Sequence, residues 1–240
     1  MPRLVCLSDT HGQHAALDVP DGDVLVFAGD ACSAGTPGEW AAFCRWLGAL
    51  PHAHKVVVPG NHDWPLQPSV SAWGVSARYG PATLRHARRR VEDAGAVLLM
   101  DREADVAGLR VYGSPWVPAF YRWAFNLPRG GDALAEVWSG VPERLDVLAT
   151  HTPAFGTLDR TDRGERAGCE RLADRLRQLD AVGAGPRLHV HGDIHEAAGV
   201  VAPPEGADGR TTVNASVLDL RYRLAHAPVV LDLGPRLPSS

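Results

Sequence analysis

Side chains of the kinds that bind divalent metal ions follow five separate apolar runs of the sequence. In chain order these groups are Asp9-Thr10-His11, Gly29-Asp30, Pro59-Gly60-Asn61-His62-Asp63, Thr150-His151 and His191-Gly192-Asp193-Ile194-His195. Carboxylate, amide oxygen and imidazole suit hard or borderline divalent cations, and no thiolate occurs among them. Because there are more candidate ligands than one ion needs, a site for two metal ions is the better interpretation. Two ions about 3.5–4 Å apart can hold both the attacking and the leaving oxygen of a phosphoryl displacement.

The elements that must position these groups alternate between short apolar runs and segments with helical spacing. Strands are expected at Arg3–Ser8, Asp23–Ala28, Lys55–Val58, Ala96–Met100, Leu145–Ala149, Leu188–Val190, 197–202, 211–217 and 228–233. Helices are expected at Glu39–Leu50 after a start at Thr36-Pro37, and at Pro81–Ala94, Asp132–Ser139 and Ala167–Leu179. A hairpin over Glu103–Tyr112 is expected to turn at Gly108.

This order of elements predicts an α/β layered fold. The late strands follow one another without helices between them, which predicts mixed rather than purely parallel sheets. In open α/β sheets, ligands bind beyond the carboxyl ends of the strands. The five metal-binding groups are therefore expected to converge on one crevice, although they span most of the chain.

The composition is typical of a soluble globular protein. The chain has 240 residues, of which 45% are hydrophobic, and a formal net charge of −4 with its 11 histidines neutral. A negative balance argues against bulk binding of nucleic acid, which usually needs a basic surface. No apolar stretch approaches the roughly 20 residues needed to cross a bilayer, and no signal peptide is visible.

Cysteine usage and segment composition complete the outline of the chain. The four cysteines form no Cys-x-x-Cys pair, which predicts reduced thiols in a cytoplasmic protein. We expect a single domain over residues 1–233, with a turn at 203–210 and a frayed tail at 234–240.

Together, the Asp-x-His, Gly-Asp, Gly-Asn-His-Asp, lone His and terminal Gly-x-x-His motifs resemble the calcineurin-like metallophosphoesterase superfamily. Their order and spacing match from residue 9 to residue 195. Three segments resemble its metallophosphoesterase-domain-containing (MPPED-like) branch: Tyr112–Trp116, Trp123–Gly130 and Leu188–Glu196. The resemblance implies a four-layer αββα sandwich of two mixed β-sheets with flanking helices. It also implies a phosphodiesterase that acts on small phosphodiesters, including cyclic nucleotides.

The resemblance implies a role for each motif. The implied ligands are Asp9, His11 and His195 for one ion, Asn61 and His151 for the other, and Asp30 as the bridge between both. His62 resembles the general acid that protonates the leaving alkoxide, and Asp63 resembles its orienting partner. The nucleophile would be a hydroxide bridging the two ions, available at neutral pH because coordination lowers the pKa of water to roughly 7. Attack would be in line and in one step, without a phosphoenzyme.

One position departs from the family pattern, which ends in Gly-His-x-His with two metal-binding histidines. Here Asp193 occupies a position of the second metal. Asp193 can bind through oxygen, which favours manganese or magnesium over zinc, or it can be too short and leave a weak second site. As a third alternative, His191 substitutes for it. The expected cofactors are two divalent ions, manganese first, with iron, zinc or magnesium as alternatives.

The segment Ser114–Arg129 is rich in aromatic residues and contains the candidates for substrate binding. In one interpretation it forms a cleft wall that stacks a base or an aryl leaving group, with Trp116 and Asn126 in the wall and Arg129 near phosphate. In the other it is an aromatic packing cluster, since aromatic residues dominate protein cores. The short segment Asn214-Ala215-Ser216 resembles a family element near the site and is expected to support it.

The activity that these observations favour is metal-dependent hydrolysis of a small phosphodiester or nucleotide, without membrane association. A phosphomonoesterase is the alternative within enzymes. A nucleotide- or metal-binding regulator with little turnover is the alternative outside them, because Asp193 replaces a usual metal ligand. The sequence assigns no oligomeric state.

Overall fold

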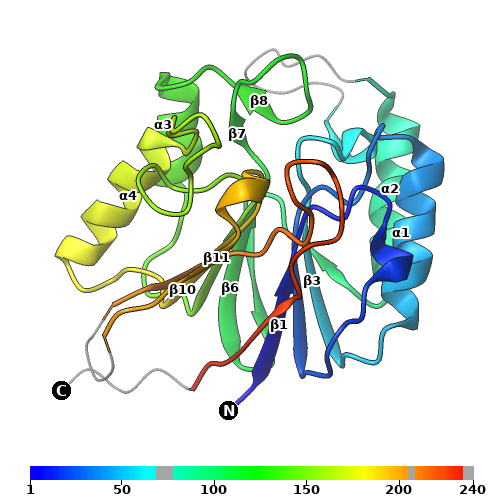
Figure 1. The fold of residues 1–240 in the computed structure, drawn as a ribbon, viewed down its shortest axis with the longest axis horizontal. Coiled ribbons are helices and arrows are strands. Elements are labelled where there is room, and N and C mark those ends of the chain that lie inside the picture. The colour runs from blue at the N-terminus through cyan, green and yellow to red at the C-terminus, as the bar shows by residue number, and fades with distance from the viewer. Residues whose placement is uncertain (69–77, 205–208, 235–240) are drawn as a thin grey trace.

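Two β-sheets lie face to face in the middle of the molecule, and a pair of helices covers the outer face of each (Figure 1). The computed structural model describes residues 1–68, 78–204 and 209–234. The layers follow one another as helices, sheet, sheet, helices. This is the four-layer αββα sandwich that the family resemblance implied.

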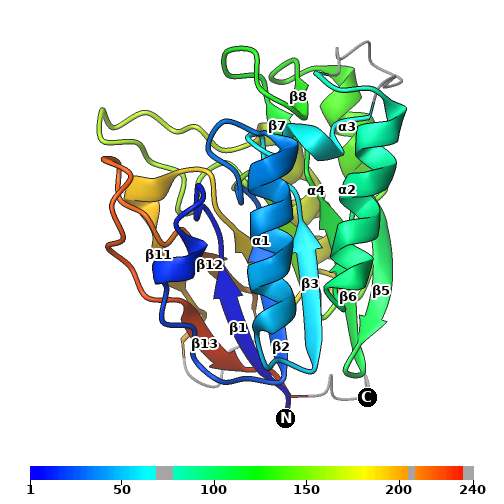
Figure 2. The same cartoon turned by 90° about the vertical axis from the view of Figure 1, so that its right-hand side faces the viewer.

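The first sheet contains five strands. They are β1 (Arg3–Leu7), β2 (Val24–Ala28), β3 (His54–Val58), β4 (Val97–Leu98) and β13 (Val229–Asp232). Their spatial order is β13-β1-β2-β3-β4, with β1 to β4 parallel and β13 antiparallel to β1. Helices α1 (Pro37–Ala49) and α2 (Pro81–Asp93) lie side by side on its outer face (Figure 2).

The second sheet contains six strands. They are β5 (Arg102–Val106), β6 (Leu109–Ser114), β9 (Val147–Thr150), β10 (Leu188–His191), β11 (Gly199–Val201) and β12 (Thr211–Asn214). Their spatial order is β11-β12-β10-β9-β6-β5, and among the described residues only the two edge pairings are antiparallel. Helices α3 (Asp132–Ser139) and α4 (Glu170–Ala181) cover it. Both sheets are mixed, as expected.

Alternate side chains of the central strands enter two different hydrophobic layers. In β1, Leu4 and Cys6 belong to the cluster between the two sheets. Val5 and Leu7 belong to the cluster that contains the helix residues. All four are fully buried. A strand that is covered on both faces is apolar at every position, which explains the uninterrupted run before Asp9.

Helix α1 begins where the sequence indicated. Thr36 accepts a hydrogen bond from the backbone N–H of Glu39, and the Glu39 carboxylate accepts one from the N–H of Thr36. This reciprocal capping box satisfies two N–H groups that a helix start leaves without partners. The buried stripe of the helix includes Phe43, whose ring lies 4.5 Å from that of Phe27 on β2. Cap and stripe together fix the helix against the first sheet.

Several expected elements are shorter than the sequence indicated, and local contacts explain two of them. The helix expected at 167–179 begins at Glu170, because Cys169 makes backbone hydrogen bonds to Pro153 and Phe155 instead. The strand expected at 211–217 ends at Asn214, after which Ser216 bridges to Ser8 at the end of β1.

The structure adds a short pair of strands that the sequence did not indicate, β7 (Val117–Pro118) and β8 (Asn126–Leu127). It also adds three 3₁₀ turns, η1 (His14–Ala16), η2 (Trp64–Leu66) and η3 (His195–Ala197). The expected turn at 203–210 and tail at 234–240 lie largely outside the described residues. Within the described ranges, no helix has the length and apolarity to span a membrane.

Candidate metal centre and active site

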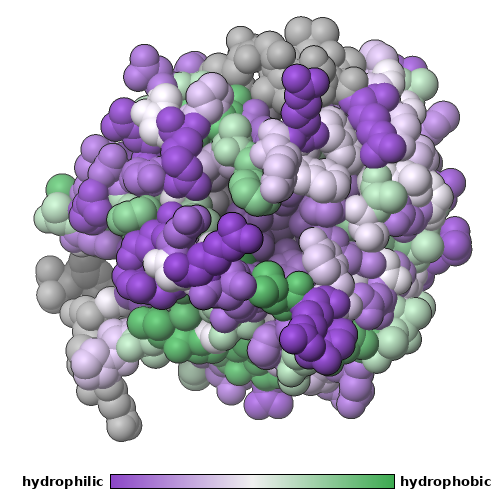
Figure 3. All heavy atoms as spheres, turned by 45° about the horizontal axis from the view of Figure 1, so that its top comes forward, coloured by the Kyte–Doolittle hydropathy of each residue, from purple (hydrophilic) through white to green (hydrophobic). Residues whose placement is uncertain are grey.

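The polar groups that follow β1, β2, β3, β9 and β10 meet at the carboxyl ends of these strands. The face on which these ends open is hollowed near its centre and lined largely by hydrophilic residues (Figure 3). The side chains that come together there are Asp9, His11, Asp30, Asn61, His62, His151, Asp193 and His195. We call this set the polar cluster. The expected convergence of groups far apart in the sequence is therefore present.

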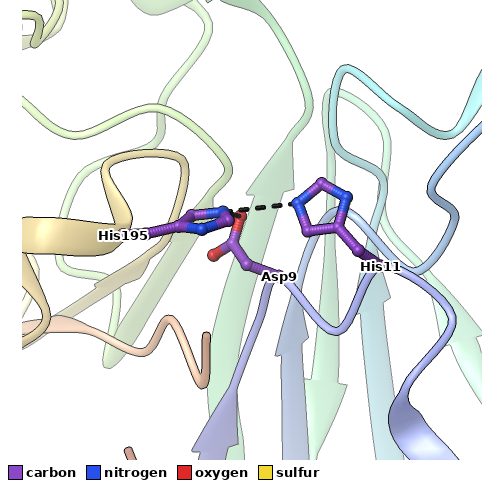
Figure 4. Close-up of side chains that lie close together, drawn as sticks. All are labelled: Asp9, His11 and His195. Carbon is purple, nitrogen blue, oxygen red and sulfur yellow. Dashed lines mark hydrogen bonds and ion pairs between the residues drawn. The ribbon is translucent and has the colours of Figure 1, made fainter. Parts of the chain in front are cut away.

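One side of the polar cluster is formed by Asp9, His11 and His195 (Figure 4). His195 Nε2 lies 3.5 Å from Asp9 Oδ1. The Nε2 atoms of His11 and His195 face each other at 3.3 Å. The Nε2 atom of a neutral imidazole carries either a lone pair or a proton. A cation between two such atoms would interact favourably with the lone pairs of both.

Asp30 occupies the middle of the polar cluster. Its Oδ2 lies 3.5 Å from His11 Nε2 and 4.0 Å from His62 Nε2, while its Oδ1 lies 3.4 Å from His151 Nε2. The Oδ1 atom of Asn61 is 2.9 Å from the same nitrogen of His151. The two oxygens of one carboxylate thus face two different groups of imidazoles.

The donor set fits divalent metal ions. Three groups each place one candidate ligand atom per residue within 4.8 Å of one another. The groups are Asp9, His11 and His195; His11, Asp30 and His62; and Asp9, Asp30 and His151. Mixed carboxylate and imidazole ligands of this kind suit manganese, iron and zinc.

The backbone turns sharply at several members of the polar cluster. Asp9, Asp30 and Asp193 have φ angles of 56°, 59° and 70°, and His11 has 40°. Asp and His adopt this left-handed region more readily than most residues, and such strain concentrates at functional sites. Asp9, Asp30 and Asp193 each stand two residues beyond the end of a strand, so the chain turns while the side chain remains near the end of the sheet.

Backbone carbonyls hold three of the imidazoles in place. His62 Nδ1 lies 2.6 Å from the carbonyl oxygen of Ser33, His151 Nδ1 lies 2.9 Å from that of Ala28, and His195 Nδ1 lies 3.2 Å from that of Asp219. A carbonyl only accepts hydrogen bonds, so each contact places the proton on Nδ1. The Nε2 atoms are left to face the polar cluster.

The Asp63 carboxylate has a different role from the one that the resemblance implied. It accepts backbone N–H groups from Asp30 at 3.0 Å, Ala31 at 3.4 Å, Cys32 at 3.0 Å and Gly60 at 2.8 Å. It therefore joins the loop after β2 to the loop after β3. The expectation that Asp63 orients the ring of His62 is corrected, because the contact on that ring comes from the Ser33 carbonyl.

The Asp9 carboxylate is held by two serines, one next to it in sequence and one from the segment after β12. The hydroxyls of Ser8 and Ser216 both donate to Asp9 Oδ2, at 2.5 Å and 2.6 Å. Asn214 donates to the carbonyl of Ile194, next to His195. The segment 214–216 supports the polar cluster as expected, whereas the sequence offered no signal for Ser8 beyond its place before Asp9.

Asp193 reaches the side of the polar cluster that contains His151. Its Oδ1 is 3.8 Å from His151 Nε2, and its backbone N–H donates to Asp9. Burial and the charges of Asp30 and Asp9 raise its pKa to about 6, against the opposing charge of His151. His191 instead contacts the carbonyl of Gly192, and its Nε2 has no partner among the described residues. The geometry favours Asp193 over His191 as the group that faces this side.

Close approach explains a glycine between β3 and Asn61. A Cβ atom on Gly60 would lie 2.2 Å from Asp30 Oδ1 and 2.4 Å from the Asp30 backbone nitrogen. Any side chain at this position must therefore displace the central carboxylate.

We expect Gly60→Ala to weaken manganese binding by about tenfold or more, because overpacking of 1–3 kcal/mol falls directly on Asp30. Isothermal titration of the metal-free protein measures this affinity. Gly80→Ala is the matched control, since a Cβ there meets open space within 4 Å. Equal manganese affinity in Gly60→Ala and wild type would contradict the expectation.

Acids and imidazoles of the polar cluster shift one another's protonation. Burial acts to raise the pKa values of Asp9 and Asp30, but His195 and His151 outweigh it and hold both values below the ordinary range. Burial acts to lower the pKa of His195, but its hydrogen bond to Asp9 and the charge of Asp9 raise that pKa to about 9. The pKa of His151 is likewise raised, through Asp30 against the effect of burial.

These raised pKa values predict a pH dependence of stability in the metal-free protein. A histidine whose pKa is higher in the folded state stabilises fully below its unfolded value, about 6.5, and this contribution disappears as pH rises through the folded value. We expect the free energy of unfolding to fall between pH 6.5 and about 9, the folded pKa of His195, by on the order of 2 kcal/mol. Urea unfolding in EDTA measures it. His195→Gln should make the fall shallower, and an unchanged slope would refute the assignment.

The three residues expected to bind substrate make hydrogen bonds with other parts of the protein than the polar cluster. Trp116 is 4% exposed, donates from Nε1 to Asp101 and packs edge-on against Phe125. Asn126 donates to the carbonyls of Phe120 and Tyr121, within its own loop.

Arg129 likewise makes its hydrogen bonds and its ion pair with residues outside the polar cluster. It donates to the carbonyls of Ala167 and Gly168 and pairs with Glu170 at 3.0 Å. These contacts favour the packing interpretation of the segment over a cleft wall made of Trp116, Asn126 and Arg129, because each is engaged in packing or in hydrogen bonds within the scaffold.

Two other aromatic residues lie against the polar cluster. The indole of Trp123 stacks on the ring of His62, with centroids 3.9 Å apart and planes 24° from parallel. Tyr222 places its ring edge-on to His11 and His195, at 4.8 Å and 5.3 Å. Trp123 belongs to the aromatic segment that the sequence singled out, but no local pattern distinguishes it from Trp116. Tyr222 had no sequence signal.

Comparison with known proteins identifies related chains. A family model described as calcineurin-like phosphoesterase matches residues 2–197. Metallophosphoesterase domain-containing protein 1 of Homo sapiens and that of Mus musculus are each 41% identical over 240 residues, which cover 96% of this chain and 71% of the relative. The crystal structure of phosphopantetheinyl hydrolase from Mycobacterium tuberculosis superimposes with a TM-score of 0.60 and 16% identity, covering 99% of this chain and 98% of that one. The last likeness concerns the fold alone.

Proposed function

The chain belongs to the calcineurin-like phosphoesterase family and is a metal-dependent phosphoesterase, and we propose that it hydrolyses small phosphodiesters at the polar cluster. The observation that carries the diester preference is the number of carboxylates in the cluster. Asp9, Asp30 and Asp193 all face it. Three negative charges set against two divalent cations leave a charge of about +1 when the imidazoles are neutral, and an activated hydroxide would lower it to about zero. A site of so little net positive charge favours the single negative charge of a phosphodiester over the two of a monoester dianion.

We propose specific ligands for two divalent ions. Asp9, His11 and His195 would hold one ion; Asn61, His151 and Asp193 would hold the other, and Asp30 would face both. The number of carboxylates among these ligands favours manganese, with iron, zinc and magnesium as alternatives. Bound ions would supply an activated water and neutralise charge at the phosphoryl group.

His62 is proposed as the general acid. The Ser33 carbonyl accepts the Nδ1 proton, so a second proton on Nε2 points at the polar cluster, where Nε2 stands 4.0 Å from Asp30 Oδ2. Trp123 stacks on the ring and restricts its rotation. A protonated His62 can therefore give Nε2–H to the departing oxygen without moving.

Hydrolysis of bis-p-nitrophenyl phosphate and of p-nitrophenyl phosphate, with manganese, tests the proposal. We expect the diester to have the higher kcat/KM. A higher kcat/KM for the monoester would favour a phosphomonoesterase. Nucleotide binding without hydrolysis under manganese, zinc or iron would favour a regulator.

Asp193→His is expected to raise the affinity of the second site for zinc or iron by about tenfold, because imidazole suits these ions better than carboxylate does. The site would gain one positive charge, so hydrolysis of the monoester should rise relative to the diester. Titration calorimetry and the two nitrophenyl substrates measure both effects. Asp193→Asn, which removes the charge without adding imidazole, is the control. Unchanged metal stoichiometry and rates in Asp193→His would overturn this part of the proposal.

The wider setting is also a proposal. Residues 1–233 are proposed as one domain, and the four cysteines, all buried and unpaired, are in keeping with a cytoplasmic location. The net charge of −4 favours a small phosphodiester or nucleotide as partner over a nucleic-acid polymer.

A further inference from the structure

An open hollow of about 450 Å³ lies beside His62, outside the polar cluster. It is lined by Trp64, Arg78, Tyr121, Arg122 and Trp123. Trp123 is shared between the hollow and the general acid, because the same indole stacks on the ring of His62. The hollow therefore lies next to His62, the proposed proton donor.

The lining combines aromatic surface with positive charge. Tyr121 is 79% exposed, so its ring is available to a ligand. The Arg78 guanidinium is anchored by a hydrogen bond of 2.7 Å to the carbonyl of Ala34. No carboxylate is among the described residues that line the hollow. Two guanidinium groups beside three aromatic rings favour a planar group that carries negative charge.

We propose that this hollow binds the leaving group of a linear phosphodiester, and that this leaving group carries an aromatic ring and a second negative charge. The inference rests on the proposed diesterase function, since it needs His62 to protonate the departing oxygen. Because the leaving oxygen must lie next to His62 Nε2, the remainder of the leaving group extends past Trp123. A cyclic phosphodiester keeps its leaving oxygen on the same sugar and has no second anion to place there.

A matched pair of substrates tests the charge requirement. Methyl 4-carboxyphenyl phosphate and methyl 4-carbamoylphenyl phosphate have the same shape and differ in one negative charge on the leaving group. In each, water attacks phosphorus, the aryl P–O bond breaks, and the phenol departs with a proton from His62, leaving methyl phosphate. The carbamoyl phenol is intrinsically the better leaving group, so chemical reactivity opposes the expected preference.

We expect kcat/KM for the carboxylate substrate to exceed that for the carbamoyl substrate about fivefold at low ionic strength. Arg122→Gln and Arg78→Gln should each reduce this ratio toward one, and high salt should do the same in wild type. Arg88→Gln is the matched control, because Arg88 is an exposed arginine of α2 outside the hollow. A ratio of one or less in wild type, or an equal ratio in wild type and Arg122→Gln, would overturn the proposal.

A binding measurement separates this inference from the proposed activity. The leaving product 4-hydroxybenzoate should quench tryptophan fluorescence of the metal-free protein more strongly than 4-hydroxybenzamide does, and Tyr121→Ala and Arg122→Gln should weaken that quenching. If neither diester is hydrolysed but this difference is present, the diesterase proposal fails and the hollow remains an anion-binding aromatic site. If both diesters are hydrolysed equally and quenching does not discriminate, the subsite fails and the diesterase proposal stands.

Discussion

Asp30→Asn is expected to lower the rate of phosphodiester hydrolysis by about a thousandfold or more and to reduce bound manganese from the two ions proposed above to one or none. Asp30 is the carboxylate whose two oxygens face different imidazoles, His11 and His62 on one side and His151 on the other. Asparagine keeps the shape and one acceptor oxygen but removes the negative charge. Elemental analysis after dialysis against manganese measures the stoichiometry, and bis-p-nitrophenyl phosphate measures the rate.

The control for this prediction is Asp21→Asn. Asp21 is an exposed acid before the start of β2, at the opposite end of the strand from Asp30. The Asp21→Asn variant should retain the metal content and the hydrolysis rate of the wild type. Full manganese occupancy in Asp30→Asn, with unaltered hydrolysis, would refute the central position of Asp30.

His62→Gln is expected to have an effect that depends on the leaving group. Bis-p-nitrophenyl phosphate has a leaving group that departs readily without a proton, so its kcat should fall only about tenfold. Methyl phenyl phosphate has a more basic leaving group and should lose about a thousandfold, within the range attributed to general acid catalysis. Because the ring of His62 is held by Ser33 and Trp123 rather than by metal in this proposal, manganese content should not change.

The metal content also distinguishes two roles for His62. Its Nε2 belongs to one of the groups with ligand-like spacing, together with His11 and Asp30. If His62 were a ligand, the substitution would reduce manganese content and slow both substrates equally, which contradicts the acid role. His86→Gln, at an exposed histidine of α2, is the control for loss of an imidazole.

The members of the polar cluster were predictable because each follows an apolar run that is recognisable in the sequence. A fully apolar run such as Leu4–Leu7 indicates a strand buried on both faces, and Asp9 stands just beyond its end, after Ser8. Parallel strands end at the same edge of a sheet, so residues such as Asp30 and His151 are expected to meet without any knowledge of their contacts. The charge and ligand types then follow from residue identity alone.

Contacts that depend on long-range neighbours were not predictable in the same way. Trp116 and Trp123 lie in one aromatic segment, yet the first is buried on Asp101 and the second stacks on His62. Asp63 follows His62 in sequence, but its carboxylate turns to the amides of another loop. A one-residue change in direction at a turn decides which neighbour a side chain meets, and only packing of the surrounding elements sets that direction.

The sequence by itself therefore determined the fold class, the types of the candidate metal ligands and the end of the sheets at which they gather. Strand and turn propensities act over a few residues, so they can be inferred from the sequence alone. The tertiary structure alone decided the orientation of His62, the side of the cluster that Asp193 reaches, and the aromatic hollow beside Trp123. These features join segments from different sheets and loops, so they exist only once the layers are packed together.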